Sequence, residues 1–418
     1  MKILLLSTDD IQGGAARAAY RLHQGLQGVG VTSQMLVKEK SSPDPRVIAP
    51  ITKLAQGIAK TKQTFADLPL KFYSQRQRTT FSAQWLPDTV VSQVSKIAPD
   101  VINLHWINNS YMQIETLRKL KQPLVWSLHD MWAFTGGCHY NQTCDRYINS
   151  CGMCPQLGSN QEWDLSRWIW RRKVKAWQNV NLTIVALSSW LANCAASSSL
   201  FKERRIEIIP NGIDTQIYRP IPSELAREVL NLPQDKQLLL FGSLNATSDK
   251  RKGFHLLQGT LQELRKSGYG EDLELVVFGA SEPENPPELG FKTHYLGTFA
   301  DDLSLALIYS AADVFVLPSV QDNLPNTIME AIACGTPCLG FKIGGLPDMI
   351  EHQSNGYLAQ PYKIDDLAQG IIWLLENQER YQKLAHRARE KVEQEFTSDL
   401  QAKRYLNLFR ELGGKGET

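Results

Sequence analysis

The segment 314–341 places one acidic residue directly before a predicted helix and a second acidic residue inside it. Its letters are VFVLPSVQDNLPNTIMEAIACGTPCLGF. The opening VFVL is a short apolar run, which predicts a buried strand, and the closing CLGF is expected to form the next strand. Pro325 suits the first position of a helix, and the Gly-Thr-Pro near the end of the segment is a common helix stop. We therefore expect a helix over 325–334, with Asp322 just before it and Glu330 in its second turn.

The binding of an anion is the chemistry that such a segment could carry out. In a parallel α/β sheet, a helix that follows a strand begins at the carboxyl edge of the sheet, where ligands bind. The backbone N–H groups of its first turn lack partners within the helix, and the positive end of the helix dipole faces the ligand. We therefore expect an anionic group at the start of this helix.

Composition and length limit the classes of protein to be considered. With 418 residues, two domains are expected rather than one. Hydrophobic residues make up 43% and charged residues 21%, which is typical of a soluble protein with a real core. The formal net charge of +2 argues against nucleic acid as a partner. No apolar run is long enough to span a membrane, and the N-terminal MKILLLSTDD predicts a first strand and not a signal peptide, so we expect a cytoplasmic protein.

Strand-like and helix-like segments alternate along both halves of the chain. In the first half, the predicted strands are KILLLST, VTSQMLVK, DVINLHW, PLVWSLHD and LTIVALS. The second half restarts the pattern with QLLLFGS, LELVVFGA, HYLG and DVFVLPS. Alternation of this kind on both sides of a point near residue 210 predicts an α/β fold with two doubly wound parallel sheets.

Four segments together resemble one family of enzymes. QDNLPNTIMEAIACGTPCL resembles the signature of the retaining glycosyltransferases of family 4, a GT-B-fold group that uses sugar nucleotides. Three more segments are similar and fall in the expected order along the chain: IIPNGIDTQIYRP, RKGFHLL and GGLPDMIEHQSNGYL. The resemblance implies two Rossmann-like domains that face a central cleft. The expected domains are 1–208, which binds the acceptor, and 209–394, which binds the nucleotide sugar, with a C-terminal helix at about 395–418 that joins the first domain.

The resemblance gives the two acidic residues different roles at the donor. Glu330 matches the second Glu of the signature, which accepts hydrogen bonds from the ribose hydroxyls. Asp322 stands where the family has its first Glu, near the reacting carbon, and its side chain is one methylene shorter, which could change the preferred sugar. The backbone N–H groups expected to meet the sugar and the diphosphate belong to Asn323, Leu324, Asn326 and Thr327. Asn323 replaces the Gly that is more usual at that position.

Positive charge at the diphosphate is expected from the segment RKGFHLL. Lys252 matches the basic residue that neutralises the diphosphate as it leaves. The family often has an Arg shortly after the first strand of this domain, where Ser243 stands here, so Arg251 is a candidate for the second charge. Thr298, in HYLGTF, is expected near the base of the nucleotide. Catalysis is expected to need no divalent metal.

Three residues of the N-terminal half are also expected at the site. Gly13 and Gly14 follow the first strand and precede a helix, so their backbone can approach a phosphate or an acceptor closely. His129, in SLHD at the end of a predicted strand, matches a His that faces the donor sugar.

The reaction that the resemblance implies is transfer of a hexose from a nucleoside diphosphate sugar to an acceptor hydroxyl, with retention of the anomeric configuration. No pair of acids at glycosidase spacing is evident, so we expect a front-face reaction in which the leaving diphosphate accepts the proton of the acceptor. UDP-glucose is the first expectation for the donor, and GDP-mannose is the alternative. A glycan or a lipid-linked saccharide in polysaccharide biosynthesis is the expected acceptor. The alternative hypotheses are a sugar-nucleotide epimerase and a non-catalytic sugar-nucleotide sensor.

Four of the seven cysteines lie in the stretch CHYNQTCDRYINSCGMC. They are Cys138, Cys144, Cys151 and Cys154, with the spacing C-x5-C-x6-C-x2-C. The final CGMC is typical of a zinc knuckle, and a structural zinc would hold the loop after His129. His139 and Asp145 are alternative ligands. Two disulfides and four reduced thiols are the other interpretations, and a reducing cytosol favours a metal over disulfides.

Basic and aromatic residues gather in two stretches. Residues 51–82 carry six cations against one acid, Asp67, and WDLSRWIWRRKVKAW mixes four tryptophans with five cations. One interpretation is an ordinary helix with two or three tryptophans in the core. The other is contact with an anionic membrane, at the inner face of the plasma membrane, which would suit a lipid-linked acceptor.

Overall fold

The chain divides into two compact units. In this computed structural model, the described residues are 1–49, 62, 65–242, 249–282, 284, 288–299 and 301–414. Unit 1 comprises Met1–Pro210 and Gln401–Thr418, and unit 2 comprises Asn211–Leu400. The boundary expected after residue 208 lies close to this division, and the C-terminal segment that belongs to unit 1 begins at Gln401 rather than at about 395.

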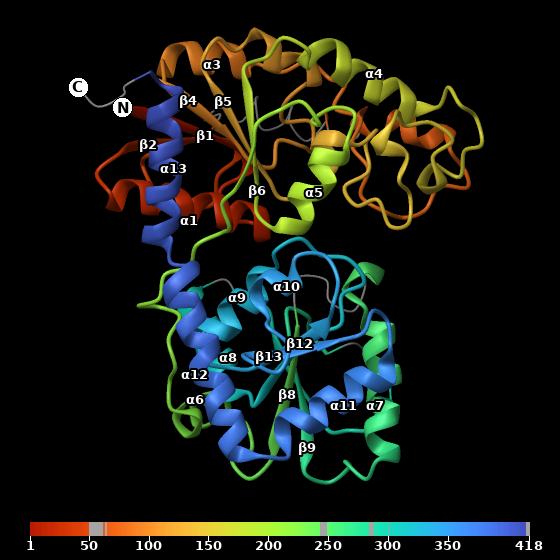
Figure 1. Ribbon diagram of the computed structural model, residues 1–418, viewed down its shortest axis with the longest axis vertical. Helices are drawn as coiled ribbons and strands as arrows, with labels where there is room; N and C mark the ends of the chain where they lie inside the picture. Colours follow the sequence, from red (N-terminus) through yellow and green to blue (C-terminus); the bar gives the residue numbers. More distant parts are fainter. Residues whose placement is uncertain are drawn as a thin grey trace. The chain divides into compact units, whose positions relative to one another are not determined.

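Unit 1 is built on a parallel sheet of seven strands in the order β3-β2-β1-β4-β5-β6-β7 (Figure 1). Its strands are β1 Lys2–Asp9, β2 Thr32–Glu39, β3 Val47–Ile48, β4 Val101–Leu104, β5 Leu124–Leu128, β6 Leu182–Ala186 and β7 Ile206–Ile208. The apolar runs in the central strands are typical of a sheet buried on both faces. The strand order reverses between β1 and β4, so the loops after these two strands diverge and leave room for a ligand.

Helices cover both faces of this sheet. Ile3 and Leu5 of β1 point to the face that packs against α1 Gly14–Gly28 and α13 Ser398–Leu412. Leu4 and Leu6 point to the opposite face, because successive side chains of a strand alternate. The helices that contribute to that opposite core are α3 Val90–Ile97, α4 Leu165–Trp177 and α5 Ser189–Ser197.

Unit 2 repeats the design with a parallel sheet of six strands in the order β10-β9-β8-β11-β12-β13 (Figure 1). Its strands are β8 Gln237–Gly242, β9 Leu273–Phe278, β10 Thr293–Gly297, β11 Val314–Leu317, β12 Cys338–Phe341 and β13 Gly356–Ala359. The helices are α6 Ser223–Leu230, α7 Phe254–Lys266, α8 Asp302–Ala311, α9 Asn326–Ala333, α10 Leu346–Met349, α11 Ile364–Leu375 and α12 Gln378–Glu395. The order reverses between β8 and β11, and the loops after these two strands carry the candidate site.

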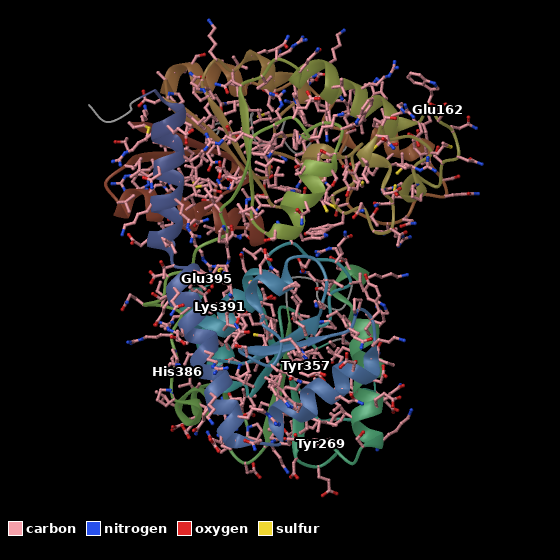
Figure 2. All side chains as sticks on the ribbon, viewed as in Figure 1. Glu162, Tyr269, Tyr357, His386, Lys391 and Glu395 are labelled. Atoms are coloured by element: carbon pink, nitrogen blue, oxygen red, sulfur yellow. The ribbon has the colours of Figure 1, made fainter. Side chains whose placement is uncertain are left out.

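The helices of unit 2 also form two layers. Helices α7 and α11 lie side by side on one face of the sheet, and α8 and α9 contact each other on the other face (Figure 1). Tyr357 of β13, labelled inside the unit in Figure 2, packs so closely under α11 that a Cβ on Gly370 would lie 2.5 Å from its ring. On α12, Lys391 and Glu395 form an ion pair of 3.0 Å one turn apart (Figure 2). Within the described residues, no helix has the length and apolar character needed to cross a bilayer.

The segment 314–341 folds closely as its spacing predicts. β11 and β12 have the expected bounds, and the helix between them is α9. The helix is one residue shorter than expected at each end, because Cys334 is its C-cap and Pro325 its N-cap. Pro325 occupies the N-cap position with φ −66° and ψ 120°, not the first helical position, so the helix begins one residue later than expected.

Candidate active site

The loops after β8 and β11 of unit 2 bring two cations onto one carboxylate. Lys252 Nζ lies 2.8 Å from Asp322 Oδ2, and Arg251 Nη1 lies 3.3 Å from the same oxygen. Asp322 is 6% exposed, whereas both cations remain partly exposed. Lys252 and Arg251 belong to a 3-10 turn, Lys250–Lys252, directly before α7. The structure therefore brings together two expected site residues that are 70 positions apart in the sequence.

Two glycines allow the loop after β11 to pack this tightly. Gly253 has a φ of +73°, and a Cβ there would lie 1.8 Å from the carbonyl oxygen of Pro318. Gly344 has a φ of +52°, and a Cβ there would lie 1.9 Å from the carbonyl oxygen of Asp322. Gly345 N–H donates to that same oxygen at 3.2 Å. The backbone that carries Asp322 is thus held between these two glycines.

The charge of Asp322 is fixed by these neighbours. Burial raises its pKa, but Lys252 and Arg251 outweigh burial, and the pKa falls to about 2. The Asn323 N–H also stabilises the charged form, because it donates to Asp322 Oδ1 at 3.1 Å. Asp322 is therefore an ionised acceptor at neutral pH and cannot act as a general acid.

The first turn of α9 lies directly after this loop and has the features of an anion site. Pro325 provides no side-chain cap, and the first turn contains no acidic residue. The first hydrogen bonds within the helix are donated by the N–H groups of Ile328 and Met329 to the Pro325 carbonyl. Thr327 Oγ1 is buried without a hydrogen-bond partner. An uncapped helix start beside an unsatisfied hydroxyl suits an anion with several acceptor oxygens.

Glu330 lies in the second turn of α9 and is 4% exposed. It accepts a hydrogen bond from the Tyr309 hydroxyl of α8 at 2.9 Å. Burial raises the pKa of Tyr309 well above its usual value, so the phenol remains a donor. Sequence reasoning missed Tyr309, because nothing in the helix-like run around it distinguishes a site residue from a core residue.

The other residues of unit 2 that are expected to bind the donor do not all lie beside Asp322. Asn323 and Leu324 are buried beside Asp322. Thr298 is exposed directly after β10, which lies two strands from β8. Ser243 lies outside the described residues.

In unit 1, the glycines after β1 form the start of α1. Gly13 is the N-cap, with φ 89° and ψ 164°, and Gly14 is the first residue of the helix. A Cβ built on Gly13 would meet nothing within 4 Å, so space exists beside this backbone. No side chain caps the helix and no acidic residue lies in its first turn. This is a second helix start that can face an anion.

His129 follows β5 and belongs to a buried polar chain whose proton positions can be assigned. Asn103 Nδ2 donates to the Val125 carbonyl at 3.1 Å and to Ser127 Oγ at 3.0 Å, so Asn103 Oδ1 faces His105 Nε2, 2.9 Å away. That oxygen can only accept, so His105 carries its proton on Nε2 and accepts at Nδ1. His129 Nε2 lies 2.9 Å from His105 Nδ1 and is therefore the donor. The lone pair of the His129 ring is then on Nδ1.

Burial keeps His129 neutral, and this polar chain fixes its orientation. Burial lowers the pKa of His129 to about 4 and the pKa of His105 well below its usual value. Ser127 extends the chain to Tyr405 of α13, because the two hydroxyls are 2.7 Å apart. Sequence reasoning selected His129 and missed Asn103 and His105. The signal in the sequence is that both residues are polar and lie on the same side of the otherwise apolar run DVINLHW.

The residues next to His129 have a structural role. Asp130 accepts hydrogen bonds from Trp106 Nε1 at 2.9 Å and from Trp132 N–H at 2.8 Å, and its Oδ2 lies 2.6 Å from His139 Nδ1. His139 Nε2 lies 2.9 Å from Ser82 Oγ. Both ring nitrogens of His139 are thus engaged, which makes the expectation that His139 could serve as a metal ligand wrong.

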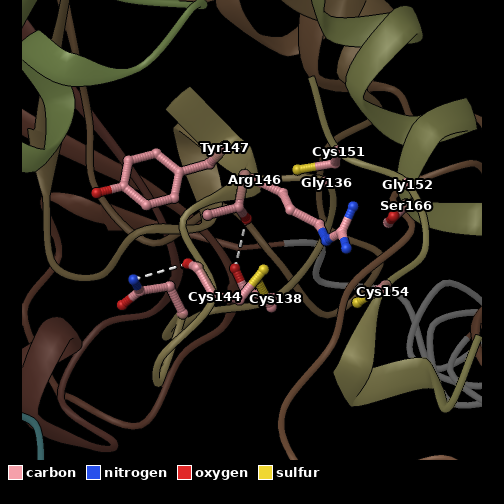
Figure 3. A pocket seen from close by; sticks show the side chains of 11 residues that line it. Gly136, Cys138, Cys144, Arg146, Tyr147, Cys151, Gly152, Cys154 and Ser166 are labelled. Atoms are coloured by element: carbon pink, nitrogen blue, oxygen red, sulfur yellow. Dashed lines mark hydrogen bonds between the residues drawn. The ribbon is translucent and has the colours of Figure 1, made fainter. Parts of the chain in front are cut away.

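The four clustered cysteines line one cavity of about 20 Å³ (Figure 3). All are free thiols, and burial raises the pKa of Cys151 to about 12, so this thiol is no nucleophile at neutral pH. His139 and Asp145 do not line the cavity. As the side chains stand, no group of three or more His, Cys, Asp or Glu among the described residues is arranged to hold a metal ion. The expected zinc is therefore not shown and stays a hypothesis.

The tryptophans of α4 and its N-terminal approach divide between core and surface. Trp177 is buried, whereas Trp163 is 64% and Trp168 is 46% exposed. Arg171 lies over the Trp163 ring at 4.3 Å and Arg172 over the Trp168 ring at 4.4 Å. The part of the 51–82 stretch up to residue 61 lies outside the described residues. Contact of these stretches with a membrane stays a prediction.

Comparison with known families agrees with this arrangement. The family model described as "Glycosyltransferase Family 4" matches residues 12–217, and the model described as "Glycosyl transferases group 1" matches residues 235–377. The first match covers most of unit 1, and the second covers the loops with Lys252 and Asp322 together with α9.

Relatives of the chain include proteins named as glycosyl or sulfoquinovosyl transferases. The chain is 25% identical over 399 residues to the putative colanic acid biosynthesis glycosyl transferase WcaC of Escherichia coli, covering 88% of this chain and 90% of that one. It is 31% identical over 106 residues to N-acetyl-alpha-D-glucosaminyl L-malate synthase of Bacillus anthracis, covering 25% of this chain and 28% of that one. The match to the sulfoquinovosyl transferase SQD2 of Arabidopsis thaliana, at 23% identity, covers 74% of this chain and 56% of that one.

Solved structures share the fold of the whole chain. Sucrose-phosphate synthase from Thermosynechococcus elongatus has a TM-score of 0.70 at 18% identity, with all of both chains covered. HepE from Anabaena, solved with UDP and glucose, has a TM-score of 0.64 at 18% identity, with 98% of this chain and 99% of that one covered. The Rossmann-like fold of both units thus recurs in known structures. One family model matches most of unit 1, and the other matches most of unit 2. The chain belongs to the group 1 glycosyltransferases, with the GT-B fold.

Proposed function

We propose that the chain transfers a hexose, with retention of configuration, from a nucleoside diphosphate sugar to a glycan or lipid-linked saccharide. The observation that supports this most is the pair of Lys252 with Asp322 directly beside the uncapped start of α9. A cation, an uncapped helix start and the unsatisfied Thr327 hydroxyl suit a diphosphate. A buried ionised carboxylate beside them suits the hydroxyls of the attached sugar.

UDP-glucose is the donor that we propose. The structural neighbour HepE was solved with UDP and glucose and also with UDP-glucose, which makes this donor the first to try. Glu330 is proposed to accept hydrogen bonds from the ribose hydroxyls, with Tyr309 holding the carboxylate in place. The name of the WcaC relative, which covers most of the chain, supports a glycan acceptor.

In the proposed reaction, the bond from the anomeric carbon to the diphosphate oxygen breaks as the acceptor oxygen bonds to the same face of that carbon. The acceptor proton passes to the leaving diphosphate oxygen. Lys252 and the start of α9 stabilise the charge that develops there, which is an electrostatic contribution of several kcal/mol in a dry site. Asp322 does not move a proton, because the two cations keep it ionised. It is proposed to accept hydrogen bonds from the sugar.

His129 is proposed to contact the donor sugar as a neutral ring. Its Nε2–H is committed to His105, so the lone pair of the ring is on Nδ1. The fixed tautomer orients this acceptor without the cost of ordering a mobile side chain.

Turnover of UDP-glucose tests the proposed function. We expect UDP release when the chain is incubated with UDP-glucose and a panel of glycan and lipid-linked acceptors, and release to be unchanged by EDTA. Proton NMR of the product is expected to show the α-configuration of the donor. Tight binding of UDP-glucose without turnover on any acceptor would favour a sensor. A β-linked product would contradict retention.

A further inference from the structure

We propose that Cys138, Cys144, Cys151 and Cys154 together bind one Zn²⁺ ion, which holds the loop between β5 and α4 in unit 1. This site is separate from the chemistry proposed above and does not depend on it.

The cavity has the size and lining of a site for a single ion. All four cysteines line it, with Thr135, Asn141, Ser166 and the glycines 136 and 152 among the other lining residues. Its volume of about 20 Å³ exceeds the roughly 10–15 Å³ that one water-sized sphere needs. It has no room for a cluster of several iron and sulfur atoms. Figure 3 shows the four cysteines placed around this pocket. Rotation about χ1 is the change needed to turn four thiols onto one ion.

The backbone around the cysteines suits thiolate ligands. Cys154 precedes a 3-10 turn, Pro155–Leu157, and hydrogen bonds from the N–H groups of Gln156 and Leu157 reach its sulfur. Cys151 receives a hydrogen bond from the Gly136 N–H in the same way. Hydrogen bonds of this kind favour the thiolate, which is the form that binds metal, whereas burial raises the pKa of both thiols above its usual value.

The glycine between the last two cysteines is also required by geometry. Gly152 has a φ of +140°, and a Cβ there would lie 2.5 Å from the carbonyl oxygen of Glu162. Gly136 is equally confined, because its Cβ would lie 2.6 Å from the Cβ of Cys151. At position 136 the chain therefore uses its least bulky residue where it passes the segment that carries Cys151.

A buried cation lies next to the cluster and gives a second, independent indication. Lys173 of α4 is 0% exposed, and its Nζ donates to the carbonyls of Thr135, at 3.0 Å, and Trp132. It also lies 3.6 Å from the centroid of the Trp132 ring. Its electrostatic neighbours include the sulfurs of Cys151 and Cys138 and the carboxylate of Asp130. One Zn²⁺ with four thiolates carries a net charge of −2, which would add to the negative charge of Asp130 beside this buried amine.

The loop itself needs such a constraint. Between β5 and α4 it has only 3-10 turns, Trp132–Phe134, Arg146–Ile148 and Pro155–Leu157, and no strand or longer helix. Loops of this length without regular structure are uncommon in compact domains. Zinc with four Cys ligands has no open position, so its role here is structural and not catalytic. Binding releases the four thiol protons and leaves sulfur at its original oxidation state, so no oxidant is needed.

Metal analysis of the full-length, untagged chain tests this site. We expect about one zinc ion per chain by inductively coupled plasma mass spectrometry, without added metal. Cys151→Ser and Cys154→Ser are expected to lower zinc to below about a tenth of an ion per chain. Cys194→Ser is the matched control, because Cys194 is a free cysteine that does not line the cavity, and it should retain the metal.

A second measurement on the wild-type chain avoids variants that fail to fold. Titration with a mercurial should release the zinc as the four cavity thiols react. Refolding with Co²⁺ should give the near-ultraviolet absorption of thiolate-to-cobalt charge transfer. The proposal is overturned if the chain contains no zinc and seven thiols react freely even after zinc is supplied. It is also overturned if the native chain is lighter by four hydrogens, which means two disulfides, or if iron and sulfide occupy the cluster.

Discussion

Replacement of Lys252 by methionine is expected to lower kcat/KM for sugar transfer by about 10³-fold, with most of the loss in kcat. Methionine keeps the length and much of the volume of the side chain and removes only the charge. The leaving diphosphate gains negative charge in the transition state. Lys252 is the cation nearer to Asp322, with its Nζ 2.8 Å from Asp322 Oδ2. The second cation, Arg251, is 0.5 Å farther from that oxygen and also pairs with Asp249.

Lys250→Met is the matched control for this prediction. Lys250 belongs to the same 3-10 turn as Lys252 but is exposed. Its replacement removes the same charge from the chain and should change kcat/KM by less than about threefold. Steady-state kinetics of UDP release measure both variants. Equal losses in the two would mean that the general positive field, and not the position of Lys252, assists the reaction.

Replacement of Gly253 or Gly344 by alanine is the other change with a large expected effect. A methyl group at either position would collide with a backbone oxygen, 1.8 Å away at Gly253 and 1.9 Å away at Gly344. A backbone atom cannot move aside as a flexible side chain can, so the loop that carries Asp322 must shift. We expect each variant to lose roughly 3 kcal/mol of stability or more, and about 10²-fold or more in kcat/KM.

Gly268→Ala is the control that separates the effect of a steric collision from the effect of a left-handed backbone conformation. Gly268 also has a positive φ, +86°, but a Cβ there meets nothing within 4 Å. Its replacement should cost only about 1 kcal/mol, the cost of left-handed backbone for a residue with a side chain, and leave kcat/KM unchanged. Calorimetric melting and UDP release provide the two readouts. If Gly344→Ala behaved like Gly268→Ala, the close packing described around Asp322 would be wrong.

The sequence predicted best those parts of the site whose structure is local. The bounds of β11 and β12 follow from short apolar runs between turn residues, and α9 follows from the Pro and Gly at its ends. The helix begins after Pro325, because a proline with ψ of 120° serves as the cap and not as the first helical residue. Helix boundaries depend on such a detail of one dihedral angle, which spacing does not determine.

Contacts between distant segments could not be predicted in the same way. The hydrogen bond of Tyr309 to Glu330 and the chain from His129 through His105 to Asn103 depend on strand order and register. The resemblance to a family selected Glu330 and His129 but not the residues that orient them. The interpretation of His139 as a metal ligand failed for a related reason. Its proximity to Cys138 in the sequence says nothing about Asp130, which engages it across the loop.

The central claim, that a nucleoside diphosphate is bound at the start of α9 beside Lys252, is tested most directly by calorimetric titration. The ligands are UDP and UMP, with GDP and GMP as a second pair, and the proteins are the wild type, Lys252→Met and Lys250→Met. The account predicts that the diphosphate of at least one pair binds about tenfold or more tightly than its monophosphate. This difference should largely disappear in Lys252→Met and persist in Lys250→Met. Equal affinity for diphosphate and monophosphate in the wild type, or a difference that survives in Lys252→Met, would contradict the account.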